Sequence, residues 1–198
     1  MLPEKIHLVD RDARLVAAWG EVFRDHAEVV AERRDFFELE ADAMVSPANS
    51  FGIMDGGLDA AIRTTIRGVD QRVLNALRNR HHGELHVGMA EIVETGDPRW
   101  PFLICAPTMR IPEDVSRSVN AYVAFRAILL EVRRHNEAGS LPQIRSILCS
   151  GLCTGVGAMP PRRCAAQMRI AYRQVLGTPE LPPFEAIHEV HRAMRTAT

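Results

Sequence analysis

Two segments of the sequence combine glycine with side chains that could bind a nucleotide. Residues 46–62 carry Asn49, two adjacent glycines and Asp59, and residues 151–161 carry three glycines followed by two prolines. Glycine lets the backbone approach an anion closely with several N–H groups, and a following helix N-terminus adds partial positive charge. The second segment therefore suits a phosphate or diphosphate. It has no lysine before Thr154, so it is not a Walker A loop.

Each of these features also has a purely structural explanation. A tight turn between a strand and a helix accounts for the second segment about as well as a phosphate site does. Asn49 can brace its own loop through hydrogen bonds to the backbone, and Asp59 can cap the apolar helical run that follows it. The residue types alone make a nucleotide site a hypothesis and leave both explanations open.

Short apolar runs alternate with segments of helical periodicity along the chain. Strands are predicted at 6–9, 29–31, 43–46, 87–93, 102–106 and 146–149, and helices at 15–23, 62–77 (one or two, with Gly68 as the break), 119–132, 165–176 and 184–194. Because the strands are apolar on both sides, we predict an α/β sandwich with a mixed, mostly parallel sheet. Ligands of such sheets bind at the carboxyl ends of the strands, where both glycine-rich segments fall.

Composition and charge exclude several classes of protein. The chain has 198 residues, of which 46% are hydrophobic and 25% charged, as in an ordinary globular protein and unlike a disordered one. The net charge of −1 lacks the excess of a general nucleic-acid binder, although basic residues can still gather locally. No apolar run approaches the roughly 20 residues of a membrane span. We expect one cytoplasmic domain over residues 1–198, without membrane contact.

Metal and thiol chemistry have little support in the sequence. The chain has no Cys-x-x-Cys pair, so we expect reduced thiols, no metal and no cofactor. His188 and His191 are one residue short of a His-Glu-x-x-His zinc motif. Cys153 is either a modifiable thiol or a packing residue. Tyr172 and Phe184 are expected in the core.

The two glycine-rich segments and their flanks resemble the macrodomain family. Residues 42–49, Asp-Ala-Met-Val-Ser-Pro-Ala-Asn, resemble the family's Asp-Ala-Ile-Val-Asn-Ala-Ala-Asn, and residues 56–62 resemble its glycine run followed by Val-Asp-x-x-Ile. The interval of ten from Asn49 to Asp59 matches the Asn/Asp pair of its hydrolase members. Residues 154–160 resemble its Thr-Gly-Ile-x-Gly-x-Pro loop.

This resemblance covers about residues 27–176 and implies a three-layer α/β/α fold that binds ADP-ribose. The strand–helix unit 6–25 and the helix 184–194 are then additions. Asp35, in the place of the family's Gly-Asp-Ile-Thr segment, is implied to accept a hydrogen bond from adenine, and without the resemblance it is a solvated turn residue. The loop 154–158 is implied to wrap the diphosphate. The implied ligand-binding residues are Asp35, Phe36, Ala48, Asn49, Gly56, Gly57, Asp59, Thr154, Gly155, Val156, Gly157 and Ala158.

The sequence departs from the family pattern at several positions. Ser46 and Pro47 replace the first Asn and Ala of the Asn-Ala-Ala-Asn motif, and Asp55 precedes a glycine run that is cut to two. A carboxylate there repels a diphosphate unless it points to the ribose or to solvent. Gly157 stands where many members carry an aromatic residue and Ala158 where they carry glycine, which removes a wall of the distal-ribose pocket.

The match of Asn49 and Asp59 to the family's hydrolase members implies an ADP-ribosyl hydrolase that acts on ADP-ribose joined to an acidic side chain, a nucleic-acid end or an acetyl group. Asn49 and Asp59 are the implied catalytic pair, with Asn49 orienting the ribose. Because a helix start stabilises an anion, we expect Asp59 to be a weak base that orients water. The alternative is a reader that binds ADP-ribose or an ADP-ribosylated protein or nucleic acid without cleavage, and the shortened glycine run and the missing aromatic residue favour it. A receiver-like domain built on Asp10 and Asp12 is a third, weaker reading.

Overall fold

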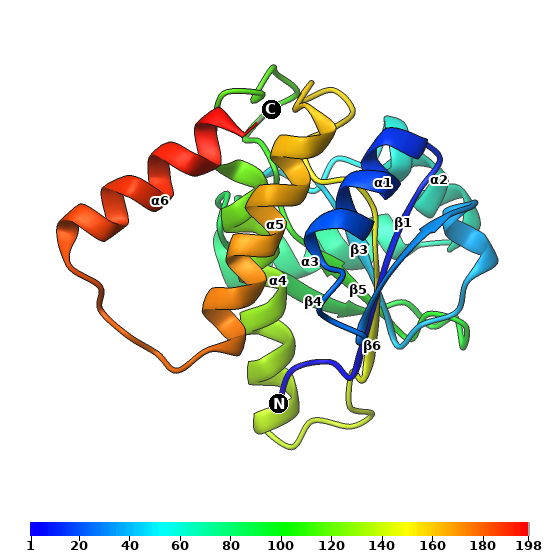
Figure 1. Ribbon diagram of the computed structural model, residues 1–198. Coiled ribbons are helices and arrows are strands. Elements are labelled where there is room, and N and C mark those ends of the chain that lie inside the picture. The colour runs from blue at the N-terminus through cyan, green and yellow to red at the C-terminus, as the bar shows by residue number, and fades with distance from the viewer. Residues whose placement is uncertain (198) are drawn as a thin grey trace.

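The computed structural model describes residues 1–197 and shows one mixed sheet in the order β2-β1-β6-β3-β5-β4 (Figure 1). The strands are β1 (Lys5–Asp10), β2 (Val29–Arg33), β3 (Ala43–Ser46), β4 (Glu91–Glu94), β5 (Phe102–Cys105) and β6 (Ser146–Cys149). All neighbouring pairs are parallel except β4 with β5 at one edge. The predicted α/β sandwich with a mixed, mostly parallel sheet is confirmed.

Helices cover both faces of the sheet. They are α1 (Ala13–Val22), α2 (Gly57–Thr65), α3 (Val69–His81), α4 (Asn120–Glu137), α5 (Pro161–Leu176) and α6 (Phe184–Thr196), with a short 3₁₀ turn at Phe36–Glu38. Successive side chains of a strand point to opposite faces. Val45 accordingly packs in one core with α1, α4 and α5, whereas Met44 packs in a second core with α2 and α3. The two cores and the sheet between them make three layers.

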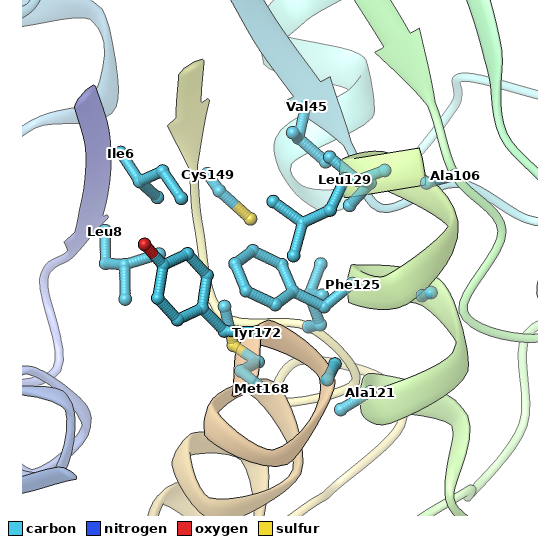
Figure 2. Close-up of a cluster of buried hydrophobic side chains, with 14 of the residues drawn as sticks. Ile6, Leu8, Val45, Ala106, Ala121, Phe125, Leu129, Cys149, Met168 and Tyr172 are labelled. Atoms are coloured by element: carbon cyan, nitrogen blue, oxygen red, sulfur yellow. The ribbon is translucent and has the colours of Figure 1, made fainter. Parts of the chain in front are cut away.

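The larger core lies between β1, β3, β5 and β6 and the helices α4 and α5. Figure 2 shows Phe125 of α4 facing Tyr172 and Met168 of α5, with Leu8 of β1 beside them. Tyr172 is buried in this core as predicted, and its hydroxyl donates a hydrogen bond to Glu28. The prediction for Phe184 is wrong, because this side chain is 68% exposed at the start of α6.

The N-terminal strand lies inside the sheet rather than beside it. β1 pairs with β2 on one side and with β6 on the other, so its carboxyl end stands next to that of β6. The unit 6–25, expected as an addition, therefore contributes to the edge of the sheet where ligands bind. α6 is peripheral: it packs against α5, and Met194 is its buried residue.

The structure corrects the start of one predicted strand and divides one predicted helical segment into two helices. The strand expected at 87–93 begins only at Glu91, because Gly88 has a φ of +93° and residues 87 and 89 form a turn around it. The helical segment 62–77 is divided into α2 and α3 at Gly68, whose φ is +77°. Among residues 1–197, no helix combines the length and apolar character that crossing a membrane requires.

Candidate functional site

A cavity of about 460 Å³ opens at the carboxyl ends of β1, β3 and β6. This volume is in the range of small-molecule sites. The structure brings together here all the predicted ligand-binding residues except Ala158: Asp35, Phe36, Ala48, Asn49, Gly56, Gly57, Asp59, Thr154, Gly155, Val156 and Gly157. Both glycine-rich segments thus face one space, although they are about a hundred residues apart in the sequence.

The loop after β6 lines this cavity and has backbone N–H groups that are free to bind an anion. Within residues 1–197, the N–H groups of residues 154–157 donate no hydrogen bond, whereas the N–H of Met159 donates to the carbonyl of Cys153 at 2.9 Å. The N–H of Ala158 donates to the carbonyl of Gly155 at 3.0 Å, and Ala158 does not line the cavity, so its contact with a ligand stays a prediction. A row of free N–H groups just before a helix is a physical basis for anion binding.

Gly157 is required by the close approach of the backbone. A Cβ atom added there would lie 2.6 Å from the carbonyl oxygen of Cys153 and 2.7 Å from Val115. The N–H of Val115 donates to the carbonyl of Gly157 at 3.1 Å, which ties this loop to the segment before α4. A larger residue at position 157 therefore has no space in this loop conformation, whatever its effect on the pocket wall.

Asp35 lies at one end of the cavity and is held from two sides. Its Oδ1 accepts the N–H of Phe37 at 2.9 Å, and its Oδ2 accepts a hydrogen bond from the guanidinium of Arg11. These two partners, the backbone N–H first, hold the pKa of Asp35 below its usual value. Phe36 is buried next to it. Asp35 is thus a fixed carboxylate on the wall of the cavity.

Asn49 braces the loop after β3. Its Nδ2 donates to the carbonyl of Ile53 at 2.8 Å, and its Oδ1 accepts the N–H groups of Phe51 at 3.0 Å and Ile53 at 3.3 Å. The structural explanation for Asn49 is therefore correct. One N–H of its amide remains for a ligand hydroxyl, since an amide nitrogen carries two.

Asp59 is buried in the first turn of α2, with 8% of its surface exposed. Burial raises its pKa to about 6; the hydrogen bond from the Ser46 hydroxyl, 2.7 Å from Oδ1, opposes this shift, and the charge of Asp55 adds to it. The expectation that the helix start makes Asp59 a weak base is wrong, because loss of hydration outweighs the helix dipole. A carboxyl with this pKa can exchange a proton near neutral pH.

The charges around the cavity are mostly negative. Arg11 and Arg34 lie on its wall with Asp10, Asp35, Asp55 and Asp59. Asp10 is committed to the backbone, since its carboxylate accepts the N–H groups of Asp12 at 2.9 Å and Gly151 at 3.3 Å. A bound diphosphate would therefore depend on backbone N–H groups more than on cationic side chains.

Thiol and metal chemistry find no support at this site. Cys153 lines the cavity but is buried, and burial raises the pKa of its thiol to about 12, so that the packing reading holds. Across the described residues 1–197, no group of three or more potential metal ligands is found.

Sequence reasoning missed the contribution of β1 to the site. Asp10 and Arg11 line the cavity directly after this strand, and Thr108 and Ser150 line it after two others. The available signal was their position at the end of an apolar run, because such ends meet at one edge of a parallel sheet. The pairing of Arg11 with Asp35 leaves no local signal, since 24 residues separate them.

A model of the Macro domain family matches residues 45–168. The chain belongs to this family. A protein of Aquifex aeolicus, named only as uncharacterised, is 30% identical over 131 residues, which are 66% of this chain and 72% of the relative. The match sets aside the receiver-like reading of Asp10 and Asp12.

Solved structures of macro domains share the fold. The macrodomain of Mycobacterium tuberculosis DarG matches with a TM-score of 0.58 and 19% identity, over 72% of this chain and 88% of that one. A mutant of the Oceanobacillus iheyensis macrodomain, solved with ADPR, matches with a TM-score of 0.59 and 16% identity, over 81% of this chain and 88% of that one. At these identities the likeness concerns the fold alone.

The close packing at Gly157 predicts the effect of a single methyl group. In Gly157→Ala, the free energy of unfolding should fall by about 1–3 kcal/mol, because the loop must shift away from Cys153. Gly155→Ala is the matched control, since nothing lies within 4 Å of an added Cβ there. Urea denaturation of both variants measures the difference, and equal losses would contradict the role of the close approach.

The raised pKa of Asp59 predicts a pH dependence of stability. The folded protein holds the proton of Asp59 up to about pH 6, whereas the unfolded chain loses it near pH 4. The contribution of Asp59 to the free energy of unfolding is therefore greatest below pH 4, and it falls by about 3 kcal/mol as the pH rises to 6. In Asp59→Asn this fall should disappear. The free energy of unfolding of the variant, compared with that of the wild type, should therefore be higher at pH 8 than at pH 4. Urea denaturation from pH 4 to 8 measures it, and the control is Asp97→Asn, at a half-buried aspartate whose pKa is lowered by the hydrogen bonds of Arg99. Parallel curves for Asp59→Asn and the wild type would refute the assignment.

Proposed function

We propose that this protein binds ADP-ribose in the cavity at the carboxyl ends of β1, β3 and β6. The observation that carries the proposal is the row of free N–H groups of residues 154–157 on the wall of that cavity. A diphosphate offers two anionic groups to such a row. Membership of the macro domain family and the likeness to a macrodomain solved with ADPR support the same ligand.

The two ends of the cavity differ in ways that fit the two ends of ADP-ribose. In the proposed orientation, Asp35 accepts the amino group of adenine beside Phe36, and the distal ribose lies near Asn49 and Asp59. Asp35 is held ionised by Phe37 and Arg11, which suits an acceptor. Asp59 is the buried carboxyl whose pKa is raised, which suits proton transfer. Ala48, Gly56 and Gly57 line the space next to this end of the cavity.

We further propose that the protein hydrolyses the bond between the distal ribose and an attached group. Asp59 then accepts a proton from the attacking water and returns it to the leaving group, so that water is added across the cleaved bond and Asp59 ends in its starting state. The free N–H of Asn49 orients a ribose hydroxyl. Ser46 positions Asp59 through its hydrogen bond. No metal or organic cofactor is needed for this reaction.

A reader without catalysis is the second candidate. The observation that favours it is the commitment of Asn49, whose carbonyl oxygen and one N–H already serve the backbone. In either case the proposed partners are ADP-ribose and proteins or nucleic acids that carry it. The four cysteines are unpaired. This suits a reducing compartment, so we propose the cytoplasm, and one domain for the whole chain.

Calorimetry with ADP-ribose tests the binding proposal. The wild type should bind one ADP-ribose, with AMP and NAD much weaker, and Asp35→Asn should weaken binding about tenfold or more, because a charged acceptor is lost. Asp97→Asn is the matched control: Asp97 also accepts a backbone N–H and pairs with an arginine, and it does not line the cavity. A wild type that does not bind ADP-ribose would overturn the proposal.

Turnover of a mono-ADP-ribosylated peptide, of an ADP-ribosylated oligonucleotide and of O-acetyl-ADP-ribose tests hydrolysis. Asp59→Asn should lower kcat at least about a hundredfold, and Asn49→Ala should lower it as well. Ser46→Ala should move the acid limb of the kcat/KM profile to higher pH, because the Ser46 hydrogen bond lowers the pKa of Asp59. Binding of ADP-ribose without turnover of any of these substrates would assign the protein as a reader.

A further inference from the structure

A second cleft, outside the site described above, is lined by basic side chains. It has a volume of about 380 Å³ and lies where α6 meets the segment before α4 and the start of α5. Its lining residues are Arg117, Arg163, His188, His191, Arg192, Arg195 and Thr196. No carboxylate of the described part of the chain is among them. We call this space the arginine cleft.

The basic residues of α6 follow the helical repeat. His188, His191, Arg192 and Arg195 are spaced by three or four residues, which places them on one side of the helix. From His188 to Arg195 this stripe is about 10 Å long at 1.5 Å per residue. It therefore presents a row of hydrogen-bonding side chains, of which Arg192 and Arg195 carry the charge.

Backbone carbonyls, and not acids, hold two of the guanidinium groups. Arg163 donates from Nη1 to the carbonyl of Ser116 at 2.8 Å and from Nε to that of Ala197 at 3.3 Å, and Arg195 donates from Nε to that of Arg117 at 3.1 Å. No arginine of the cleft forms an ion pair within residues 1–197. The remaining donors of Arg163 and Arg195 are therefore positioned by the backbone and are not taken up by an acidic side chain, so they can bind an anion.

We propose that the arginine cleft binds the phosphodiester backbone of a single-stranded nucleic acid. Arginine matches phosphate with its planar fork of donors, and the four arginines that line the cleft offer donors to more than one phosphate. An exposed aromatic side chain lies beside the row: the ring of Phe184 packs edge-to-face on His188, with centroids 4.5 Å apart. A cationic groove with an adjacent aromatic for base stacking is the arrangement that such strands recognise.

The arginine cleft and the ADP-ribose cavity share structural elements. The segment before α4 has Pro112 on the cavity and Arg117 on the cleft. Arg163 is six positions after Gly157 in the sequence, at most about 20 Å of chain. Figure 1 shows the C-terminal end of α6 meeting the loop before α4 at the same end of the molecule as the start of α5. A strand held in the cleft could thus present an ADP-ribosylated end to the cavity. This link, which makes ADP-ribosylated nucleic acid the substrate class, rests on the proposed function.

Fluorescence anisotropy with a labelled 12-nucleotide oligodeoxythymidine tests the arginine cleft. In Arg192→Gln with Arg195→Gln, the affinity should fall, and the slope of log K against log salt should become shallower by about 1.4, since about 0.7 is lost for each phosphate contact. Arg192→Gln alone, which spares the bond of Arg195 to Arg117, should lose about half as much. The charge-matched control is Arg67→Gln with Arg78→Gln, two exposed arginines of the α2–α3 region.

A variant of the aromatic side chain separates stacking from charge. Phe184→Ala should lower the affinity for the oligonucleotide about tenfold while leaving the salt slope unchanged, because no phosphate contact is removed. Poly-glutamate, an acidic competitor, should displace the labelled oligonucleotide only at a far higher concentration of negative charge than unlabelled oligonucleotide needs. Equal displacement by poly-glutamate would assign the cleft to acidic polymers and overturn the proposal.

The remaining outcomes separate this inference from the function on which its link rests. Wild-type protein that does not bind the oligonucleotide, or equal affinities for the cleft variant and the control variant, would overturn the arginine cleft. ADP-ribose titrated into the same preparations should bind equally to all of them. Loss of oligonucleotide binding with intact ADP-ribose binding confirms two separate sites, whereas failure of ADP-ribose to bind the wild type overturns the proposed function and leaves the cleft standing.

Discussion

The position of β6 between β1 and β3 is the constraint on which the rest of this structure depends. The strand comes late in the chain, yet it pairs in parallel with two strands from the first quarter. The carboxylate of Asp42 secures this junction by accepting the N–H of Ser146 at 2.7 Å and its hydroxyl at 2.9 Å. Because the three strands are parallel, the loop of residues 151–160 emerges between the loops that carry Asp10 and Asn49. The cavity is a direct consequence of this insertion.

Within that cavity, local stability and ligand binding make opposite demands on the same groups. Asp59 is buried where its charge is costly, and its pKa of about 6 records that cost. The free N–H groups of the loop after β6 are likewise a deficit that only an anion or water removes. Asn49 differs from these groups, because most of its hydrogen-bonding atoms are already bonded to the backbone of its own loop. Such uncompensated polar groups are typical of functional sites.

The sequence predicts most of the fold because the strands are short, apolar on both faces and bounded by glycine, proline or aspartate. It also predicts most of the cavity wall, since glycine-rich loops after parallel strands must meet at one edge. It fails where the answer depends on distant residues. The pairing of Arg11 with Asp35, the burial that raises the pKa of Asp59 and the exposure of Phe184 each result from tertiary packing. At Gly88 the backbone conformation overrides the pattern of side chains, so that the strand begins only at Glu91.

Although the net charge of the chain is near neutral, the structure has two sites that differ in how they attract an anion. The ADP-ribose cavity offers backbone N–H groups among carboxylates, so its attraction for phosphate acts at short range and depends on loop geometry. The arginine cleft offers guanidinium charges that form no ion pair within residues 1–197, so its attraction acts at longer range and weakens with salt. A site of the first kind discriminates by shape, and one of the second kind captures and retains a polyanion. A protein that combines them can select for the attached nucleotide and for its carrier independently.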